Sequence, residues 1–309
     1  MKRREPAKSP GALLCICAFS AFVFLSSCVT THSSSGVFDR DLFIGTIIAE
    51  KQFGNFIDAQ AMSVDAFGNI YVVDRSAPGV FKFDQHGDSI RAVVAFGKEH
   101  DQFDGPVDID ASLTNAVAVA DRNNHRIEIY SKDLIWQASI SGHEAGSKIR
   151  FGYPLEVHAG QAGNYFIIDG ENKRALSLQP SSGSQQVITT SGSESGAGMN
   201  PVSLAIGDNE FVTIADANSR SLVVFNNAYL PQAGARYPDA GGSKLSSSEN
   251  FLYAFDPAAG AIRIFDAASL NYRGSLALPR EANHPVAFYV HKGDCYILTK
   301  EKVIVCSKN

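Results

Sequence analysis

Four side chains in this sequence could together hold a cation: Asp108, Asp110, Glu156 and His158. The members of each pair are two residues apart, so in an extended strand both point to the same side. Three carboxylates and one imidazole suit Ca²⁺, Mn²⁺ or another divalent cation, and they can also orient a positively charged ligand. The alternative is that these side chains hydrogen-bond to water and to neighbouring backbone, as buried polar groups commonly do.

A repeat in the sequence indicates how the strands that carry these pairs are arranged. Six pairs of residues, each fifteen positions apart, mark its copies: Ala59 and Asp74, Pro106 and Asp121, Pro154 and Asp169, Pro201 and Asp216, Gly241 and Asp256, and Pro285 and Lys300. Within a copy, alternating apolar residues predict one strand. An apolar run, a polar turn and a second alternating run then predict a hairpin. Repeats of this size are typical of propeller blades, which bury their faces against one another.

The second copy carries the most specific motif. Gly105-Pro106 opens its first strand, and Asp121-Arg-Asn-Asn-His-Arg126-Ile127 forms its turn. This copy resembles the NHL repeat, whose signature is a Pro-led inner strand and an Asp-x-x-Asn-x-Arg-Ile turn. The third copy matches it at Asp169 and Arg174. The resemblance implies an all-β, six-bladed β-propeller over residues 38–309. The four candidate side chains would then line its central channel, where NHL repeats usually have small residues.

The pairs Asp121 with Arg126 and Asp169 with Arg174 are predicted to be structural, because they recur at the same turn. An acid at that position can accept hydrogen bonds from turn amides and pair with the arginine, which fixes the hairpin. His125 lies in the same turn and is expected to be a solvated loop residue.

The ring also needs a closing strand. The last copy provides three strands before Asn309, whereas residues 42–50 form an apolar strand with no partner in their own blade. We therefore predict that residues 42–50 supply the outermost strand of the sixth blade, which leaves no blade with an exposed face.

Residues 1–27 are predicted to be a signal peptide. A basic head precedes an apolar stretch, Gly11 to Phe24, that is too short to span a bilayer comfortably. Leu25-Ser26-Ser27-Cys28 resembles the bacterial lipobox, which implies cleavage before Cys28 and its lipidation; an ordinary signal peptide is the alternative. Residues 28–37 then form a flexible tether. Val29 favours the outer membrane, facing the periplasm, by resemblance to enterobacterial sorting.

The charge of the chain restricts its partners. Residues 1–27 hold four basic residues and one acidic residue, so the formal net charge goes from −5 to −8 when they are removed. No basic run or aromatic-basic interleaving occurs, which argues against nucleic acid and against electrostatic docking to anionic lipid. Membrane contact is expected through the lipid anchor alone, and the propeller is expected to be a monomer.

Two cysteines, Cys295 and Cys306, remain after the signal peptide and Cys28 are set aside. If the last hairpin turns at Lys300-Glu301, these two residues face each other on adjacent strands. In an oxidising periplasm this register suggests a disulfide, and two buried free thiols are the alternative.

Loops that lead into the inner strands are rich in glycine and carry aromatic residues. Phe103, Phe151, Tyr153 and Tyr237 would surround the channel mouth and form a binding face there. Alternatively, these aromatic side chains are wedged between blades.

The predicted function is a lipid-anchored module of the cell envelope that binds a protein partner or a ligand and is not catalytic. A metal-dependent lyase or lactone hydrolase with its site in the channel is the alternative, because NHL-like and related propellers include such enzymes. No arrangement of nucleophile, base and orienting group stands out in the sequence. Propellers host many unrelated functions, so the fold does not choose between the two.

Overall fold

The computed structural model describes residues 44–112, 115–188, 198–207, 209–242, 244–291 and 293–308. The signal peptide, Cys28 and the tether predicted for residues 1–37 lie outside these ranges. Alpha-carbon contacts separate residues 1–38 from a unit that covers residues 39–309, and all the strands belong to this second unit. None of the described segments forms a helix long and apolar enough to cross a bilayer.

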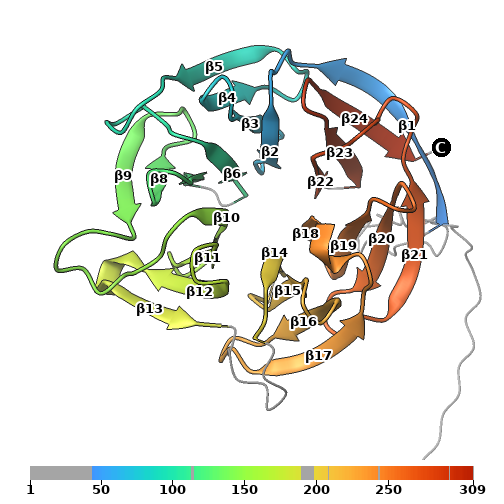
Figure 1. Cartoon of the computed structure of the whole chain (residues 1–309). Helices are drawn as coiled ribbons and strands as arrows, with labels where there is room; N and C mark the ends of the chain where they lie inside the picture. Colours follow the sequence, from blue (N-terminus) through green and yellow to red (C-terminus); the bar gives the residue numbers. More distant parts are fainter. Residues whose placement is uncertain are drawn as a thin grey trace, which may run out of the picture. The chain divides into compact units, whose positions relative to one another are not determined.

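The second unit is a six-bladed β-propeller (Figure 1). Blade one is β2 (Ala59–Val64), β3 (Ile70–Asp74), β4 (Gly79–Phe83) and β5 (Ser89–Val94). Blade two is β6 (Pro106–Asp110), β7 (Val117–Asp121), β8 (Arg126–Tyr130) and β9 (Trp136–Ser141). Blade three is β10 (Pro154–Ala159), β11 (Tyr165–Asp169), β12 (Arg174–Gln179) and β13 (Ser184–Val187). Blade four is β14 (Pro201–Ile206), β15 (Val212–Asp216), β16 (Ser221–Phe225) and β17 (Pro231–Arg236).

The last two blades share one eight-stranded sheet. Blade five is β18 (Leu245–Ser248), β19 (Phe251–Asp256), β20 (Ala261–Asp266) and β21 (Tyr272–Ala277). Blade six is β22 (Ala287–His291), β23 (Asp294–Leu298), β24 (Val303–Lys308) and β1 (Ile44–Phe53). Two short 3-10 helices, η2 (Pro180–Ser182) and η3 (Ala240–Gly242), lie in connecting segments.

Strand burial follows the apolar pattern of the sequence. The second strands of blades one, two and four read IYVVD, VAVAD and VTIAD, and every residue in them is buried. A continuous apolar run of this kind is expected for a strand covered on both faces. By contrast, β5 reads SIRAVV and is mostly exposed. The first strand of each blade therefore faces the channel, and the last strand forms the rim (Figure 1).

The closing strand β1 confirms the predicted architecture. It pairs antiparallel with β24, so that Ile47 lies opposite Lys308 and Ala49 opposite Cys306. Figure 1 shows β1 and β24, from opposite ends of the chain, side by side at the rim. In addition, residues 44–46 pair parallel with Ser275–Ala277 of β21. This second pairing was not predicted, and it is the reason why blades five and six form a continuous sheet.

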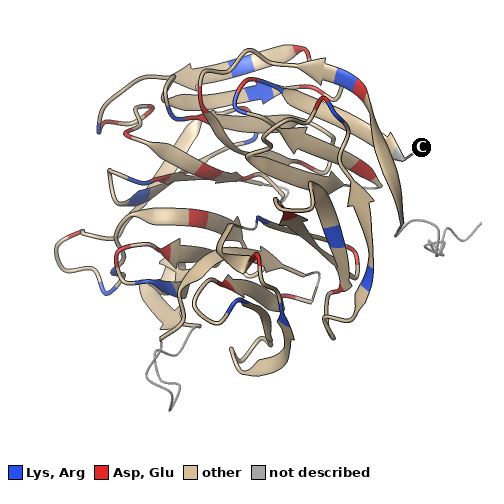
Figure 2. Cartoon of the chain, turned by 45° about the vertical axis from the view of Figure 1, so that its right-hand side comes forward, with Lys and Arg blue, Asp and Glu red and all other residues tan. Residues whose placement is uncertain are grey.

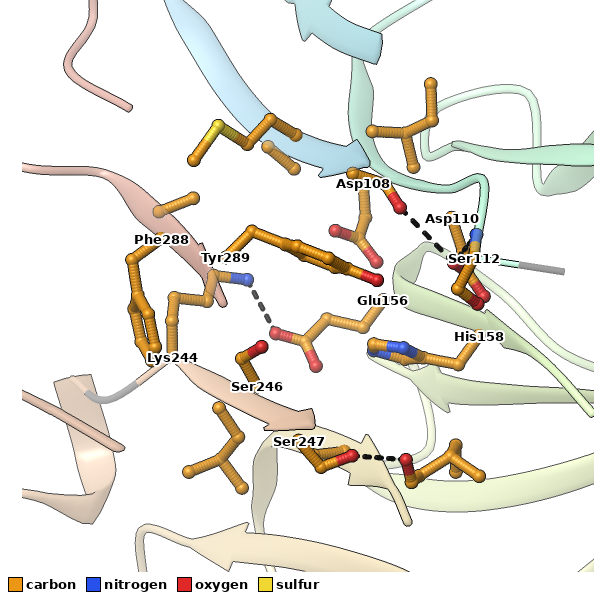
Figure 3. Close-up of a pocket in the computed structure, with 18 of the residues that line it drawn as sticks. Asp108, Asp110, Ser112, Glu156, His158, Lys244, Ser246, Ser247, Phe288 and Tyr289 are labelled. Carbon is orange, nitrogen blue, oxygen red and sulfur yellow. Dashed lines mark hydrogen bonds and ion pairs between the residues drawn. The ribbon is translucent and has the colours of Figure 1, made fainter. Parts of the chain in front are cut away.

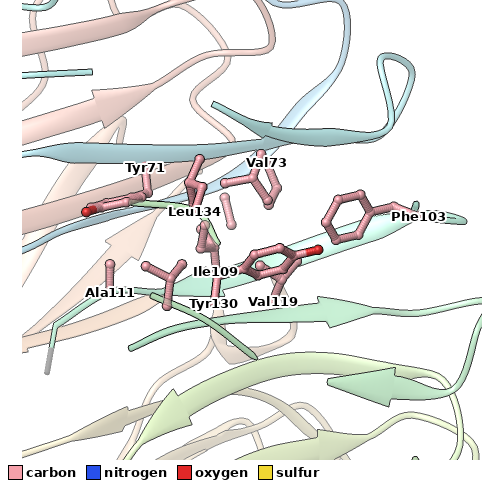
Figure 4. Close-up of a cluster of buried hydrophobic side chains, with 11 residues drawn as sticks. Tyr71, Val73, Phe103, Ile109, Ala111, Val119, Tyr130 and Leu134 are labelled. Atoms are coloured by element: carbon pink, nitrogen blue, oxygen red, sulfur yellow. The ribbon is translucent and has the colours of Figure 1, made fainter. Parts of the chain in front are cut away.

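The apolar core lies between neighbouring blades. Tyr71 and Val73 of blade one pack with Ile109, Val119 and Tyr130 of blade two (Figure 4). Comparable clusters join blades two and three, three and four, four and five, and six and one. Each blade therefore depends on its neighbours to remove its apolar faces from water.

The prediction that Phe103, Phe151 and Tyr237 form an exposed binding face is wrong. Their exposed fractions are 0%, 2% and 2%. Tyr237 packs edge-on against Phe265, with ring centroids 5.9 Å apart, and its hydroxyl donates to the Phe255 carbonyl at 3.0 Å. Phe103, Phe151 and Tyr237 each belong to an apolar cluster between two neighbouring blades. The alternative interpretation given above is correct for these three residues.

Cys295 and Cys306 face each other on β23 and β24, as the hairpin register predicted. The predicted disulfide is absent from this structure, and both residues are buried free thiols. Burial raises the pKa of Cys306 to about 12 and also raises the pKa of Cys295. Because the thiolate is the species that is oxidised, this environment disfavours bond formation.

Candidate functional site

The four predicted channel residues do converge. Asp108 and Asp110 on β6 and Glu156 and His158 on β10 line one cavity of about 100 Å³ near the axis (Figure 3). Their strands begin at Pro106 and Pro154, which set the same register in blades two and three. Alternation along each strand then directs both side chains of a pair into the channel.

The three acids link neighbouring blades. Oδ2 of Asp108 accepts a hydrogen bond from the Val157 amide at 2.8 Å, and Oδ2 of Asp110 accepts from the Ala159 amide at 2.7 Å. Oε2 of Glu156 accepts in the same way from the Leu204 amide at 2.7 Å. Each acid thus binds a backbone amide in the inner strand of the next blade. This is the second of the two interpretations offered for these residues, and it is a structural role.

Lys244 is the charged residue that the sequence analysis missed. Its Nζ donates to Oε1 of Glu156 at 2.6 Å, across the channel from blade five (Figure 3). Burial alone would lower the pKa of Lys244, but the carboxylates of Glu156 and Asp108 outweigh burial and raise it. Lys244 is therefore a cation held between two acids. A divalent metal ion at this level would have to compete with its ammonium group.

Lys244 was missed because the register predicted for blade five was wrong by one residue. Leu245 pairs with Ala254, and Asp256 begins the hairpin turn, which makes Gly242 rather than Gly241 the counterpart of Pro106. Glycine does not fix a strand start as proline does, so the slip was undetectable from spacing. Counting fifteen residues back from Asp256 gives Gly241, because the turn between β18 and β19 is one residue shorter than the turn between β6 and β7.

The register predicted for the inner strand of blade six is correct. Ala287 and Tyr289, two and four residues after Pro285, line the channel with Asp108 and Asp110. Ala287 pairs with Leu298 as Asp108 pairs with Ala120, so Thr299 rather than Lys300 occupies the position of Asp121.

Asp108 has an unusual protonation equilibrium. Burial, partly offset by the positive charge of Lys244 and reinforced by the negative charge of Glu156, raises the pKa of Asp108 to about 7. His158 acts in the opposite direction, toward a lower pKa. The charge of the channel therefore changes in the physiological range.

A wider cavity of about 260 Å³ adjoins the first at the ends of the inner strands. Ser112, Ser247 and Tyr289 line both cavities, so the two are continuous. The wider cavity also includes Glu210 and Glu249. We call this wider cavity the mouth of the channel. It lies at the ends of the inner strands, whereas the loops that were predicted to bind lie where those strands begin. The mouth is lined by the ends of inner strands and by turns between first and second strands, where Glu210 and Glu249 lie, and no binding role was predicted for these turns.

Charged residues elsewhere are distributed evenly. Figure 2 shows Lys, Arg, Asp and Glu interspersed along the visible strands and turns of the blades. The channel and its mouth differ from this background because acids predominate in their lining.

The turn pairs have the structural role predicted for them. Oδ2 of Asp121 accepts from Nε of Arg126 at 2.9 Å, and Asp169 holds Arg174 at the same distance. Asp121 also accepts from the Asp104 amide at 2.9 Å. Burial, only partly offset by these donors, raises the pKa of Asp121. Both pairs therefore join a hairpin turn to the loop that precedes the blade's first strand.

Tyr153, the remaining member of the predicted binding face, is 38% exposed. Its ring packs against His125 with centroids 4.3 Å apart, and its amide donates to Nδ1 of His125 at 3.2 Å. His125 was expected to be a solvated loop residue; instead it is half-buried and has specific partners. These contacts lie at the junction of blades two and three, on the face where inner strands begin.

No protein-family model matches the sequence, and no curated protein matches it. Solved structures do match the fold. A streptogramin B lyase structure aligns with a TM-score of 0.59 at 12% identity, covering 84% of this chain and 97% of that chain. A nidogen/laminin complex structure aligns with a TM-score of 0.55 at 16% identity, covering 73% of this chain and 82% of that chain. A structure of the WD40 repeats of RRP9 aligns with a TM-score of 0.56 at 10% identity, covering 81% of this chain and 79% of that chain. Likenesses at this identity show that the chain is a β-propeller, and they leave its function to its own residues.

Proposed function

We propose that this protein is a non-catalytic binding module of NHL type, anchored in the bacterial cell envelope, whose channel receives a positively charged ligand. One observation carries the proposal. The described residues that line the channel and its mouth include one lysine, Lys244, against five acids: Asp108, Asp110, Glu156, Glu210 and Glu249. Carboxylates in a cleft with low-dielectric walls attract cations from a distance and hold them more strongly than exposed carboxylates do.

The mouth determines which ligands fit. Its cavity of about 260 Å³ would admit an ammonium group with a short chain, whereas the inner cavity of about 100 Å³ would admit little more than the ammonium and water. We therefore propose an ammonium-bearing ligand, either a small amine or a lysine side chain presented by an envelope protein. In either case the cationic end would enter the channel first.

Binding is favoured over catalysis by what the channel acids already do. Asp108, Asp110 and Glu156 each hold a backbone amide of the next blade, and Glu156 also holds Lys244. A general base must be able to release such partners and reach the proton that it removes. The likeness to the streptogramin B lyase structure rests on an identity of 12% and identifies no catalytic residue in this chain.

The anchoring part of the proposal rests on the tetrapeptide Leu25-Ser26-Ser27-Cys28. A Cys28→Ser variant, expressed in a bacterial host that processes lipoproteins, should move from the membrane fraction to the soluble fraction. The parent protein should incorporate labelled palmitate and the variant should not. Palmitate incorporation by the variant would rule out the anchor.

Ligand binding can be measured with spermidine as a probe amine and citrate as its anionic counterpart, by isothermal titration calorimetry at low ionic strength. We expect spermidine to bind and citrate not to. The double variant Glu210→Gln/Glu249→Gln should weaken spermidine binding about tenfold or more, because it removes two charges from the mouth. Glu301→Gln, an exposed acid in the turn between β23 and β24, is the matched control. Equal losses in both variants would indicate nonspecific attraction.

The same assay has an expected pH dependence. Asp108 is neutral below its raised pKa of about 7 and negative above it. Affinity for spermidine should therefore rise by roughly three- to tenfold between pH 6 and pH 8, the effect of one added charge at an effective dielectric constant of about 20. Asp108→Asn keeps an oxygen for the Val157 amide and should flatten the profile. His158 faces the same cavity, so the pH profile of spermidine affinity should also be measured for His158→Gln.

A further inference from the structure

A second group of possible ligands lies away from the channel. His125 is in the turn between β7 and β8, His143 follows β9, and Glu171 is in the turn between β11 and β12. One ligand atom from each side chain lies within 4.8 Å of the other two. Nε2 of His143 is 3.9 Å from Oε2 of Glu171, and the two imidazole rings stack with centroids 4.3 Å apart.

The backbone around this group is fixed by hydrogen bonds. The Gly142 amide donates to the His125 carbonyl at 3.0 Å, and the Glu171 amide donates to the Gly152 carbonyl at 3.1 Å. These bonds join the loop between blades two and three to both hairpin turns. The Cα positions of the three side chains are thus set by the same contacts that align the two blades.

Gly152 leaves the space that the Glu171 carboxylate occupies. A Cβ atom on Gly152 would overlap Oε2 of Glu171, so any larger residue would push the carboxylate away. Because Gly152 has no side chain, the Glu171 carboxylate can lie against the loop near His143.

We infer that His125, His143 and Glu171 bind a divalent transition-metal ion, with Zn²⁺ as the best-matched ion. Two imidazoles and one carboxylate form a ligand set that suits zinc, whereas calcium and magnesium prefer oxygen ligands alone. Three protein ligands leave a coordination position for water or for an outside group. Ligand atoms separated by up to 4.8 Å need to approach one another by up to about 1.4 Å to reach tetrahedral zinc–ligand bonds near 2.1 Å.

The side chains have the freedom to make that approach. The side chains of His143 and Glu171 are 53% and 48% exposed, so both have solvent on one side into which they can rotate. Nδ1 of His125 accepts from the Tyr153 amide at the protein surface, where water can replace it when the ring turns to bind metal. The Arg122 guanidinium lies 5.1 Å from the Tyr153 ring centroid and opposes an added cation.

The inference can be tested by titrating untagged, metal-free protein with ZnCl₂ in a calorimeter and with CoCl₂ in a spectrophotometer. We expect one zinc ion per chain and a cobalt absorption spectrum of a low-coordinate site with nitrogen and oxygen ligands. His143→Ala and Glu171→Gln should each weaken zinc binding at least tenfold. Gly152→Ala should do the same while removing no ligand, because the new Cβ displaces the Glu171 carboxylate.

Two controls separate this site from other sources of binding. His86→Ala removes an exposed histidine from the turn between β4 and β5 and should leave zinc affinity unchanged. His158→Ala removes the channel imidazole and should also leave it unchanged. Loss of binding in His158→Ala with retention in His143→Ala would place the metal in the channel and overturn the inference. So would the absence of stoichiometric binding by the parent protein.

Discussion

Ile47→Asn is expected to lower the free energy of unfolding by about 3–5 kcal/mol and the melting temperature by about 10 °C. Ile47 is 2% exposed and lies on β1, opposite Lys308 of β24. The substitution removes a buried aliphatic side chain from the closing strand and leaves an amide there without partners. Since β1 joins blade six to blade five, the loss should affect the whole ring.

The next residue along the strand provides the matched control. Ile48 is 43% exposed, because alternation along β1 turns its side chain toward solvent. Ile48→Asn should change the melting temperature, measured by differential scanning calorimetry, by no more than about 2 °C. If the two variants melted at the same temperature, β1 would not be packed as described.

Asp121→Ala should have a comparable effect, about 3–5 kcal/mol, because it breaks a buried ion pair and leaves the Asp104 amide without its acceptor. Arg126 donates to Asp121 at 2.9 Å and to the backbone carbonyls of Lys98 and Gln102 at 2.7 Å. Without Asp121 the guanidinium keeps only Glu128, 2.7 Å away, as an acidic partner. The loop that it holds should then exchange its amide hydrogens faster.

The experiment combines thermal melting with hydrogen exchange followed by mass spectrometry. Faster exchange should be concentrated in residues 98–104 and in the turn that follows β7. Asp84→Ala is the control, since Asp84 also accepts from turn amides, at His86 and Asp88, but lies at an exposed turn. A large loss of stability in Asp84→Ala and none in Asp121→Ala would contradict the role assigned to the buried pair.

The sequence was sufficient to predict the blades whose ends are marked by specific residues. Pro106, Pro154 and Pro201 start strands and pair with the acids fifteen residues later, as the spacing indicated. A proline at a strand start and an acid at a turn are local requirements of the backbone, so they are visible in one chain. In blade five the turn between β18 and β19 is one residue shorter than its counterpart in blade two, and there the register was wrong.

Other features depend on contacts between blades and could not be predicted from local pattern. The burial of Phe103 among Val73 of blade one and Tyr130 of blade two is a property of the assembled blades. The approach of Lys244 to Glu156 across the channel is likewise a property of the closed ring. The channel position of the predicted acids was correct because it follows from strand alternation alone.

The pairing of β1 with β24 sets the order of events when the chain is made. β1 leaves the ribosome before all the other strands of the propeller and β24 after them, so the contact between them spans the whole domain in sequence. Pairings at such separation form slowly, and until they form the flanking sheets have unpaired edges that promote aggregation. The ring can therefore close only after β24 has been synthesised, which leaves a period during which export or a chaperone can act on an open chain.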